Sequence, residues 1–128
     1  MKIKEAVIVE GIYDKIKLEQ LIDALVIPTN GFGIFNDKNL IEMIKKIAQK
    51  SGIIIFTDSD RAGFIIRRYI QSFVPARYIK HAYIPEIHGK EKRKDKPGKE
   101  GLLGVEGVSK EIIIQALKNA QNDSEIKL

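Results

Sequence analysis

Apolar residues along the chain follow two patterns, one typical of buried strands and one typical of amphipathic helices. Short continuous runs rich in Val and Ile predict buried strands, since they lack the alternation of a half-exposed strand. These runs occupy 5–10, 24–29, 52–57 and, in a less apolar form, 78–84. Between and after them, apolar residues recur at helical spacing. The predicted helices span 14–22, 37–50, 62–73 and 108–120.

This order of elements predicts an α/β fold. Strands that alternate with helices favour a mostly parallel central sheet, here of about four strands, with helices on both of its faces. The run at 52–57 is apolar throughout, as expected for a central strand. Pro28 in the run at 24–29 indicates a sheet edge or a strand end. The chain should therefore form three layers in a Rossmann-like arrangement.

Acidic residues stand at the ends of two predicted strands. Asp58 and Asp60 follow the run at 52–57, and Glu10 ends the run at 5–10. Functional sites in parallel sheets collect at the carboxyl ends of strands, so these carboxylates are expected to be neighbours. Such groups raise one another's pKa unless a cation lies between them, and Mg²⁺ prefers carboxylate oxygen. In the alternative interpretation, Asp60 only caps the next helix and Asp58 is solvated.

Composition adds one basic segment to this picture. The 128 residues suffice for one domain with a core, and the absence of cysteine excludes disulfides and thiolate metal sites. Net charge is +5, and residues 88–99 hold six of the 22 Lys and Arg but two of the 17 Asp and Glu. This segment suits a polyanion, although a solvated loop explains it equally well. Without a signal peptide or membrane span, a soluble cytoplasmic protein is expected.

The acidic motifs together resemble the Toprim domain of topoisomerases, bacterial primases, certain nucleases and recombination mediators. That family has E-G-x-x-D after its first strand and D-x-D-x-x-G after a later one. The matching residues are Glu10, Gly11, Asp14, Asp58, Asp60 and Gly63. Segments 29–31, 80–85 and 104–117 further resemble the family of ribonucleases that mature bacterial 5S ribosomal RNA, which extends the likeness to about Ala120.

This resemblance implies an endoribonuclease with a three-layer Toprim fold. It would hydrolyse structured double-stranded RNA, namely the 5S ribosomal RNA precursor with a ribosomal protein, using Mg²⁺, for which Mn²⁺ can substitute. Asp58 and Asp60 would hold the metal, with Glu10 as a third ligand or a general acid/base. No membrane and no small-molecule organic cofactor is implied.

Further residues follow from the same resemblance. The loops that support the carboxylates would contain Gly11, Asp14, Asn30, Gly31 and Gly63, with Asp14 also near the start of a helix. Contacts with the RNA backbone would come from Lys90, Lys92, Arg93, Lys94, Lys96 and Lys99. Glu106, in a glycine-rich stretch before the last helix, is a further candidate for the site.

The sequence also departs from the family. Ile12 stands where a lysine often follows E-G, and Ser59 stands where the maturation enzymes often have proline. We expect one catalytic domain at 1–121, with a basic, glycine-containing loop at 88–107. Residues 122–128 would begin a linker to a C-terminal domain that is missing or absent here, so this fragment alone is expected to have weak activity or none.

Two other functions remain open at this stage. A Toprim module can bind nucleic acid or assist assembly without catalysis, as in recombination mediators. A small-molecule phosphatase of the D-x-D type would use Asp58 as a nucleophile. In such phosphatases, however, the motif usually follows the first strand, whereas here it follows the third.

Overall fold

The computed structural model describes residues 1–84 and 108–122, which fold around a sheet with the strand order β2-β1-β3-β4-β5. The first four strands are parallel, and β5 is antiparallel to β4. The strands are β1 (Ala6–Val9), β2 (Val26–Pro28), β3 (Ile53–Asp58), β4 (Ile79–Ile84) and β5 (Gln121–Asn122). The helices are α1 (Ile12–Leu21), α2 (Lys38–Ser51), α3 (Arg61–Gln71) and α5 (Lys110–Lys118), with short 3₁₀ helices η1 (Gly31–Asn36) and η2 (Ala76–Tyr78).

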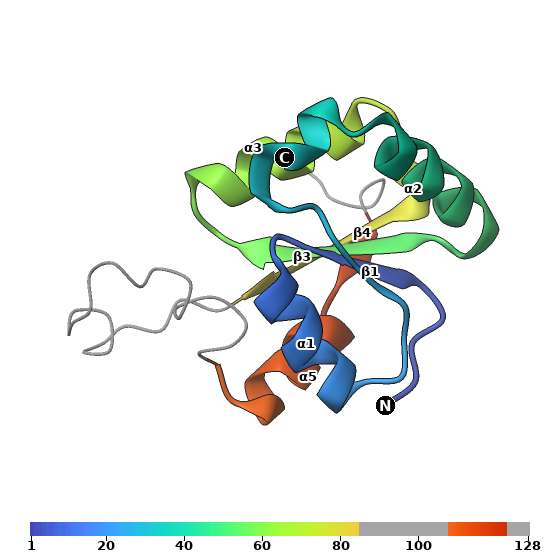
Figure 1. The fold of residues 1–128 in the computed structure, drawn as a ribbon. Helices are drawn as coiled ribbons and strands as arrows, with labels where there is room; N and C mark the ends of the chain where they lie inside the picture. Colours follow the sequence, from blue (N-terminus) through green and yellow to red (C-terminus); the bar gives the residue numbers. More distant parts are fainter. Residues whose placement is uncertain (85–107, 123–128) are drawn as a thin grey trace.

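Both faces of the sheet are covered by helices, as the apolar strands predicted. In β3, Ile53 and Ile55 pack towards α2 and α3, whereas Ile54 and Phe56 pack towards α1 and α5. Figure 1 shows α2 and α3 on one side of the sheet and α1 and α5 on the other. All five residues at 53–57 are buried, because successive side chains of a strand point to opposite faces and each face carries its own core.

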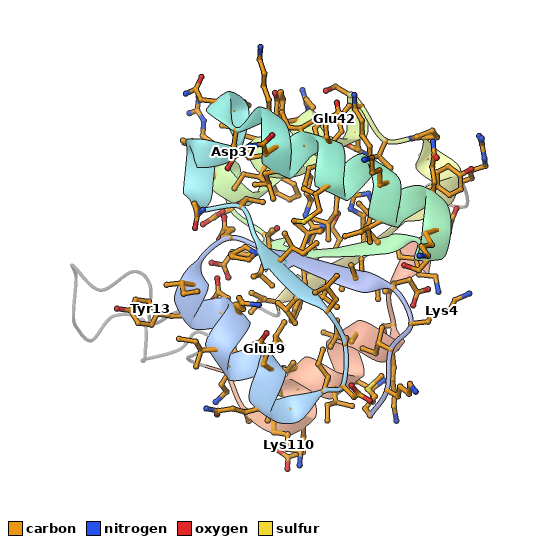
Figure 2. The ribbon with its side chains drawn as sticks, turned by 45° about the vertical axis from the view of Figure 1, so that its right-hand side comes forward. Lys4, Tyr13, Glu19, Asp37, Glu42 and Lys110 are labelled. Carbon is orange, nitrogen blue, oxygen red and sulfur yellow. The ribbon has the colours of Figure 1, made fainter. Side chains whose placement is uncertain are left out.

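The predicted α/β architecture is confirmed, and β2 lies at an edge with Pro28 as its last residue. No helix among the described residues is long and apolar enough to cross a membrane. Figure 2 shows charged side chains such as Lys4, Glu42 and Lys110 on the outside of the layers.

Three elements differ from their predictions. The first helix begins at Ile12 rather than at residue 14. Gly11 occupies its N-cap position, and the Asp14 side chain in the first turn accepts a hydrogen bond from the Gly11 N–H. Residues 31–36, which follow the predicted strand at 24–29 and lie outside every predicted element, form the 3₁₀ helix η1. After the predicted last helix, residues 121–122 add the short strand β5, which the sequence did not predict. The Asn122 amide donates to the Arg77 carbonyl at 3.1 Å.

The buried face of α3 is also rotated from its predicted position. The apolar repeat of the predicted helix at 62–73 consists of Ala62, Ile65, Ile66, Tyr69, Ile70 and Phe73. This repeat assigns Ile65 to the core, but the side chain is 37% exposed. The residues that face the core are Gly63, Ile66, Arg67 and Ile70. A glycine and an arginine thus occupy positions that an apolar pattern cannot reveal.

Candidate metal centre

Glu10 follows β1, and its main chain is held by a neighbouring loop. Its carbonyl oxygen accepts a hydrogen bond from the Gly31 N–H at 2.9 Å and another from the Thr29 hydroxyl at 3.3 Å. Asn30 and Gly31 reach this position with positive φ angles of 62° and 61°. The left-handed backbone is accessible to glycine and is tolerated by asparagine. This turn therefore fixes the backbone from which the Glu10 side chain projects.

Gly11 and Asp14 fix the other side of the same backbone. The Gly11 N–H donates to Asp14 Oδ2 at 3.2 Å, which ties the entry of α1 to its first turn. Asp14 is thus part of the helix start and also places a third negative charge near Glu10.

Asp58 and Asp60 stand where β3 gives way to α3. Asp60 Oδ1 accepts a hydrogen bond from the Gly63 N–H at 2.8 Å, so Asp60 is the helix cap that its position suggested. Asp58 is half-buried at the last position of β3, and Asp60 is exposed. Since β1 and β3 are neighbouring parallel strands, both acidic loops lie at one edge of the sheet, where α1 and α3 begin (Figure 1).

Gly63 allows this tight junction between β3 and α3. A Cβ atom at this position would lie 2.2 Å from the Asp58 carbonyl oxygen and 2.8 Å from Thr57 Oγ1. Both distances are far below van der Waals contact. A side chain at position 63 would therefore displace the backbone that carries Asp58.

Burial and neighbouring negative charges destabilise the ionised forms of Glu10 and Asp58. Burial, and to a smaller extent the charges of Asp58, Asp60 and Asp14, together raise the pKa of Glu10 from 4.5 to about 7. Burial also raises the pKa of Asp58 from 3.8 to about 6, with Asp60 and Asp14 again contributing. Arg67 partly offsets the shift at Glu10. At neutral pH the cluster therefore favours any added positive charge.

We expect the metal-free protein to lose stability as the pH rises from about 4 to about 7. In this window the folded protein keeps protons on Glu10 and Asp58 that the unfolded chain has released, so their ionisation opposes folding. Thermal unfolding in EDTA should show this decline, and Glu10→Gln should flatten it. Mg²⁺ added at pH 8 should raise the Tm of the unmodified protein more than that of the variant. Identical pH profiles for the two proteins would contradict the expectation.

The chemistry of the donors fits a hard divalent cation. Three carboxylates from two neighbouring strand ends supply oxygen ligands, which Mg²⁺ and Mn²⁺ prefer. Within 1–84 and 108–122, however, no group of three or more acidic or histidine side chains is placed so that it could hold a metal ion. The charges of Asp58 and Asp60 nevertheless contribute to the raised pKa of Glu10. The role of these three residues as metal ligands remains a prediction.

Arg67 is a residue of this region that the sequence analysis missed. Its side chain is 2% exposed and lies between α3, β3 and β4. Its guanidinium donates to Thr57 Oγ1 at 3.0 Å, to the Ile55 carbonyl at 3.1 Å and to the Ala82 carbonyl. It also contacts His81 Nδ1 at 2.7 Å. The sequence signal for this residue was its position, because helical spacing places Arg67 on the same face as the buried residues Gly63 and Ile70.

Arg67 also links the core to the acidic edge. Its guanidinium carbon lies 3.9 Å from the centre of the Tyr83 ring, which favours the charged form. Burial lowers the pKa of Arg67 to about 10, so it stays charged at neutral pH. Arg67 donates a hydrogen bond to the Thr57 side chain and therefore positions the end of β3 just before Asp58.

The remaining predicted residues lie outside the described part of the chain. These are the basic residues Lys90, Lys92, Arg93, Lys94, Lys96 and Lys99, and the acid Glu106. Their roles stay as predictions from the sequence.

Comparison with known proteins gives consistent matches. The family model described as Toprim domain matches residues 5–87. Ribonuclease M5 of Bacillus anthracis is 40% identical over 125 residues, which is 98% of this chain and 62% of that protein. Ribonuclease M5 of Clostridium acetobutylicum and of Bacillus subtilis are each 38% identical over 125 residues. The chain thus spans about three fifths of the length of these relatives.

Proposed function

The chain belongs to the Toprim domain family, and on this basis we propose that it is a metal-dependent endoribonuclease domain acting on structured double-stranded RNA. The observation that carries the proposal is the set of acids at adjoining strand ends, two of which have strongly raised pKa values. Relatives that bear the name Ribonuclease M5 and match nearly the whole chain support RNA as the substrate.

Asp58 and Asp60 would bind a divalent ion in this mechanism. Mg²⁺ is the proposed ion, and Mn²⁺ can substitute for it. A divalent cation at this site would polarise the scissile phosphate and lower the pKa of bound water. The Glu10 carboxyl group, with a pKa of about 7 before an ion binds, can take up or release a proton near neutral pH. Gly11 leaves the space beside it free of a side chain, so a phosphate can approach.

The proposal extends to the substrate and to the parts of the chain. We assign catalysis to residues 1–121 and contacts with the RNA backbone to the loop at 88–107, whose lysines suit a duplex read by shape and charge. The precursor of 5S ribosomal RNA, bound by a ribosomal protein, is the proposed substrate, in the cytoplasm. Glu106 is a further candidate for the site.

We expect the protein to cleave a 5S precursor transcript with Mg²⁺ or Mn²⁺ and to leave it intact in EDTA. Excess protein and end-labelled RNA should be used, so that a single slow turnover is detected on a sequencing gel. A DNA duplex of the same stem sequence is the matched control.

Three results, from binding, cleavage and phosphatase assays of the same protein, would contradict the proposal. Binding that persists in EDTA without cleavage of any RNA would favour a non-catalytic module. Metal-dependent cleavage of the DNA duplex alone would reassign the substrate. Turnover of a chromogenic phosphate ester that Asp58→Asn abolishes would favour a phosphatase.

A further inference from the structure

A groove of about 550 Å³ runs along the outer face of α3. Its lining is mainly apolar and aromatic, with two arginines among the apolar side chains. The residues that line it are Phe35 of η1, Arg61, Phe64, Ile65, Arg68 and Tyr69 of α3, and Ser72, which follows α3.

The groove reaches the residue that follows the D-x-D motif. Arg61 directly follows Asp60, and the lining residues from Arg61 to Ser72 recur every three or four positions. Such spacing places them on one face of the helix. The opposite face of α3 packs in the core through Ile66 and Ile70. This helix therefore has a second apolar face, which starts one residue after the D-x-D motif.

Aromatic rings form the walls of this groove and remain exposed. Phe64 is 46% exposed and Phe35 is 39% exposed. The Phe35 ring lies 4.4 Å from the Tyr69 ring, centre to centre, and Phe64 lies 6.1 Å from Tyr83 of β4. Packed rings of this kind present a rigid surface on which a flat group can stack.

The two arginines identify the chemistry of the occupant. Neither Arg61 nor Arg68 forms an ion pair within the part of the chain that the structure describes. A guanidinium binds phosphate with two parallel hydrogen bonds. Aromatic rings beside arginines, close to a site for phosphodiester chemistry, match the alternating bases and phosphates of a nucleic acid strand.

We propose that this groove binds unpaired nucleotides next to the scissile bond. Bases in a duplex are stacked on one another and do not offer their faces, whereas unpaired bases stack on protein aromatics. Phe64 would stack a base, and Arg61 and Arg68 would hold the phosphates on either side of it. The proposal deepens the function proposed above, because it makes the preferred substrate a stem that carries a single-stranded extension.

Binding without catalysis provides the test. In EDTA, fluorescence anisotropy compares a blunt RNA hairpin with the same hairpin extended by four unpaired nucleotides. The extension should improve affinity at least about fivefold, since stacking contributes substantially for each base. A 2-aminopurine in the extension should lose fluorescence when the protein binds.

Variants assign this effect to the groove. Phe64→Leu should remove both the preference for the extension and the fluorescence change, and Arg68→Gln should reduce the preference. Arg77→Gln is the matched control, because Arg77 is an exposed arginine of η2 at the amino end of β4. Circular dichroism and thermal unfolding establish that each variant is folded, and the exposed position of Arg68 makes a folding defect in Arg68→Gln unexpected.

Several results would overturn the inference. One is equal affinity for the two hairpins, and another is a preference that both groove variants retain. A dimer in sedimentation equilibrium that Phe64→Leu dissociates would assign the groove to a second copy of this chain. Failure of the proposed function gives a different result, namely a preference for the extension in EDTA with no cleavage in Mg²⁺.

Discussion

Replacing Asp58 with asparagine is expected to abolish metal-dependent cleavage while making the metal-free protein more stable. The amide keeps the size of the carboxyl group but removes the charge that would bind the proposed ion. A loss of several kcal/mol of transition-state stabilisation corresponds to about a thousandfold lower rate. The same change removes the burial of a charged group at position 58 and its repulsion by Asp60. At pH 8 in EDTA the Tm should rise by about 4 °C, which corresponds to an increase of roughly 1 kcal/mol in the free energy of unfolding.

Opposite changes in activity and stability distinguish a functional carboxylate from a structural one. If Asp58 served only to hold the strand end, Asp58→Asn would lower both cleavage and Tm. Single-turnover cleavage and thermal unfolding of the same preparation measure the two effects. Glu42→Gln, which neutralises an exposed acid on the outer side of α2, should change neither (Figure 2). Cleavage by Asp58→Asn at the rate of the unmodified protein would exclude Asp58 as a metal ligand.

Replacing Gly63 with alanine should destabilise the fold by about 3 kcal/mol. At an open helical position alanine would instead be favourable by up to about 1 kcal/mol. Here the added methyl group would meet the Asp58 carbonyl oxygen at 2.2 Å, and that oxygen belongs to the backbone of the central strand. Steric overlap is therefore expected to outweigh helix propensity, as is typical of overpacked positions. Displacement of Asp58 should also lower cleavage at least about tenfold.

Urea unfolding monitored by circular dichroism measures this loss. Gly11→Ala is the matched control, because the nearest atom to its added Cβ is Asp14 Oδ2 at 3.9 Å. This second variant should lose less than about 1 kcal/mol, the usual effect of alanine at a helix cap. A Gly63→Ala protein as stable as the unmodified one would mean that the junction between β3 and α3 can relax without cost.

The positions of the acids could be predicted from the sequence because two strong signals support them. The run at 52–57 is apolar on both faces, which indicates a central strand, and parallel connections bring strand ends to one edge. The neighbouring ends of β1 and β3 follow from these two facts alone. Asp60 as a helix cap was also recognisable, since aspartate precedes a helical repeat and its N–H partner, Gly63, lies three residues later.

The environment of α3 could not be predicted in the same way. The core face of a helix is predicted from the positions of its Ile, Leu and aromatic residues. Gly63 and Arg67 are none of these, so their presence on the buried face of α3 makes that face look polar in the sequence. The predicted stripe was consequently displaced towards Ile65, and the exposed groove beside Phe64 went unnoticed. Strand β5 was missed because two polar residues carry no periodic signal; its pairing with Lys80 and His81 depends on tertiary contacts.

The burial of Arg67 has a consequence for the order of events in this protein. Its guanidinium is fixed by strand carbonyls and by Thr57, and it reduces the repulsion felt by Glu10 whether or not an ion is bound. The positive charge of Arg67 and the raised pKa values of Glu10 and Asp58 both reduce the net negative charge of this acidic cluster. The domain is therefore expected to fold without an ion, and an ion held by the proposed ligands near neutral pH would displace protons into the solvent.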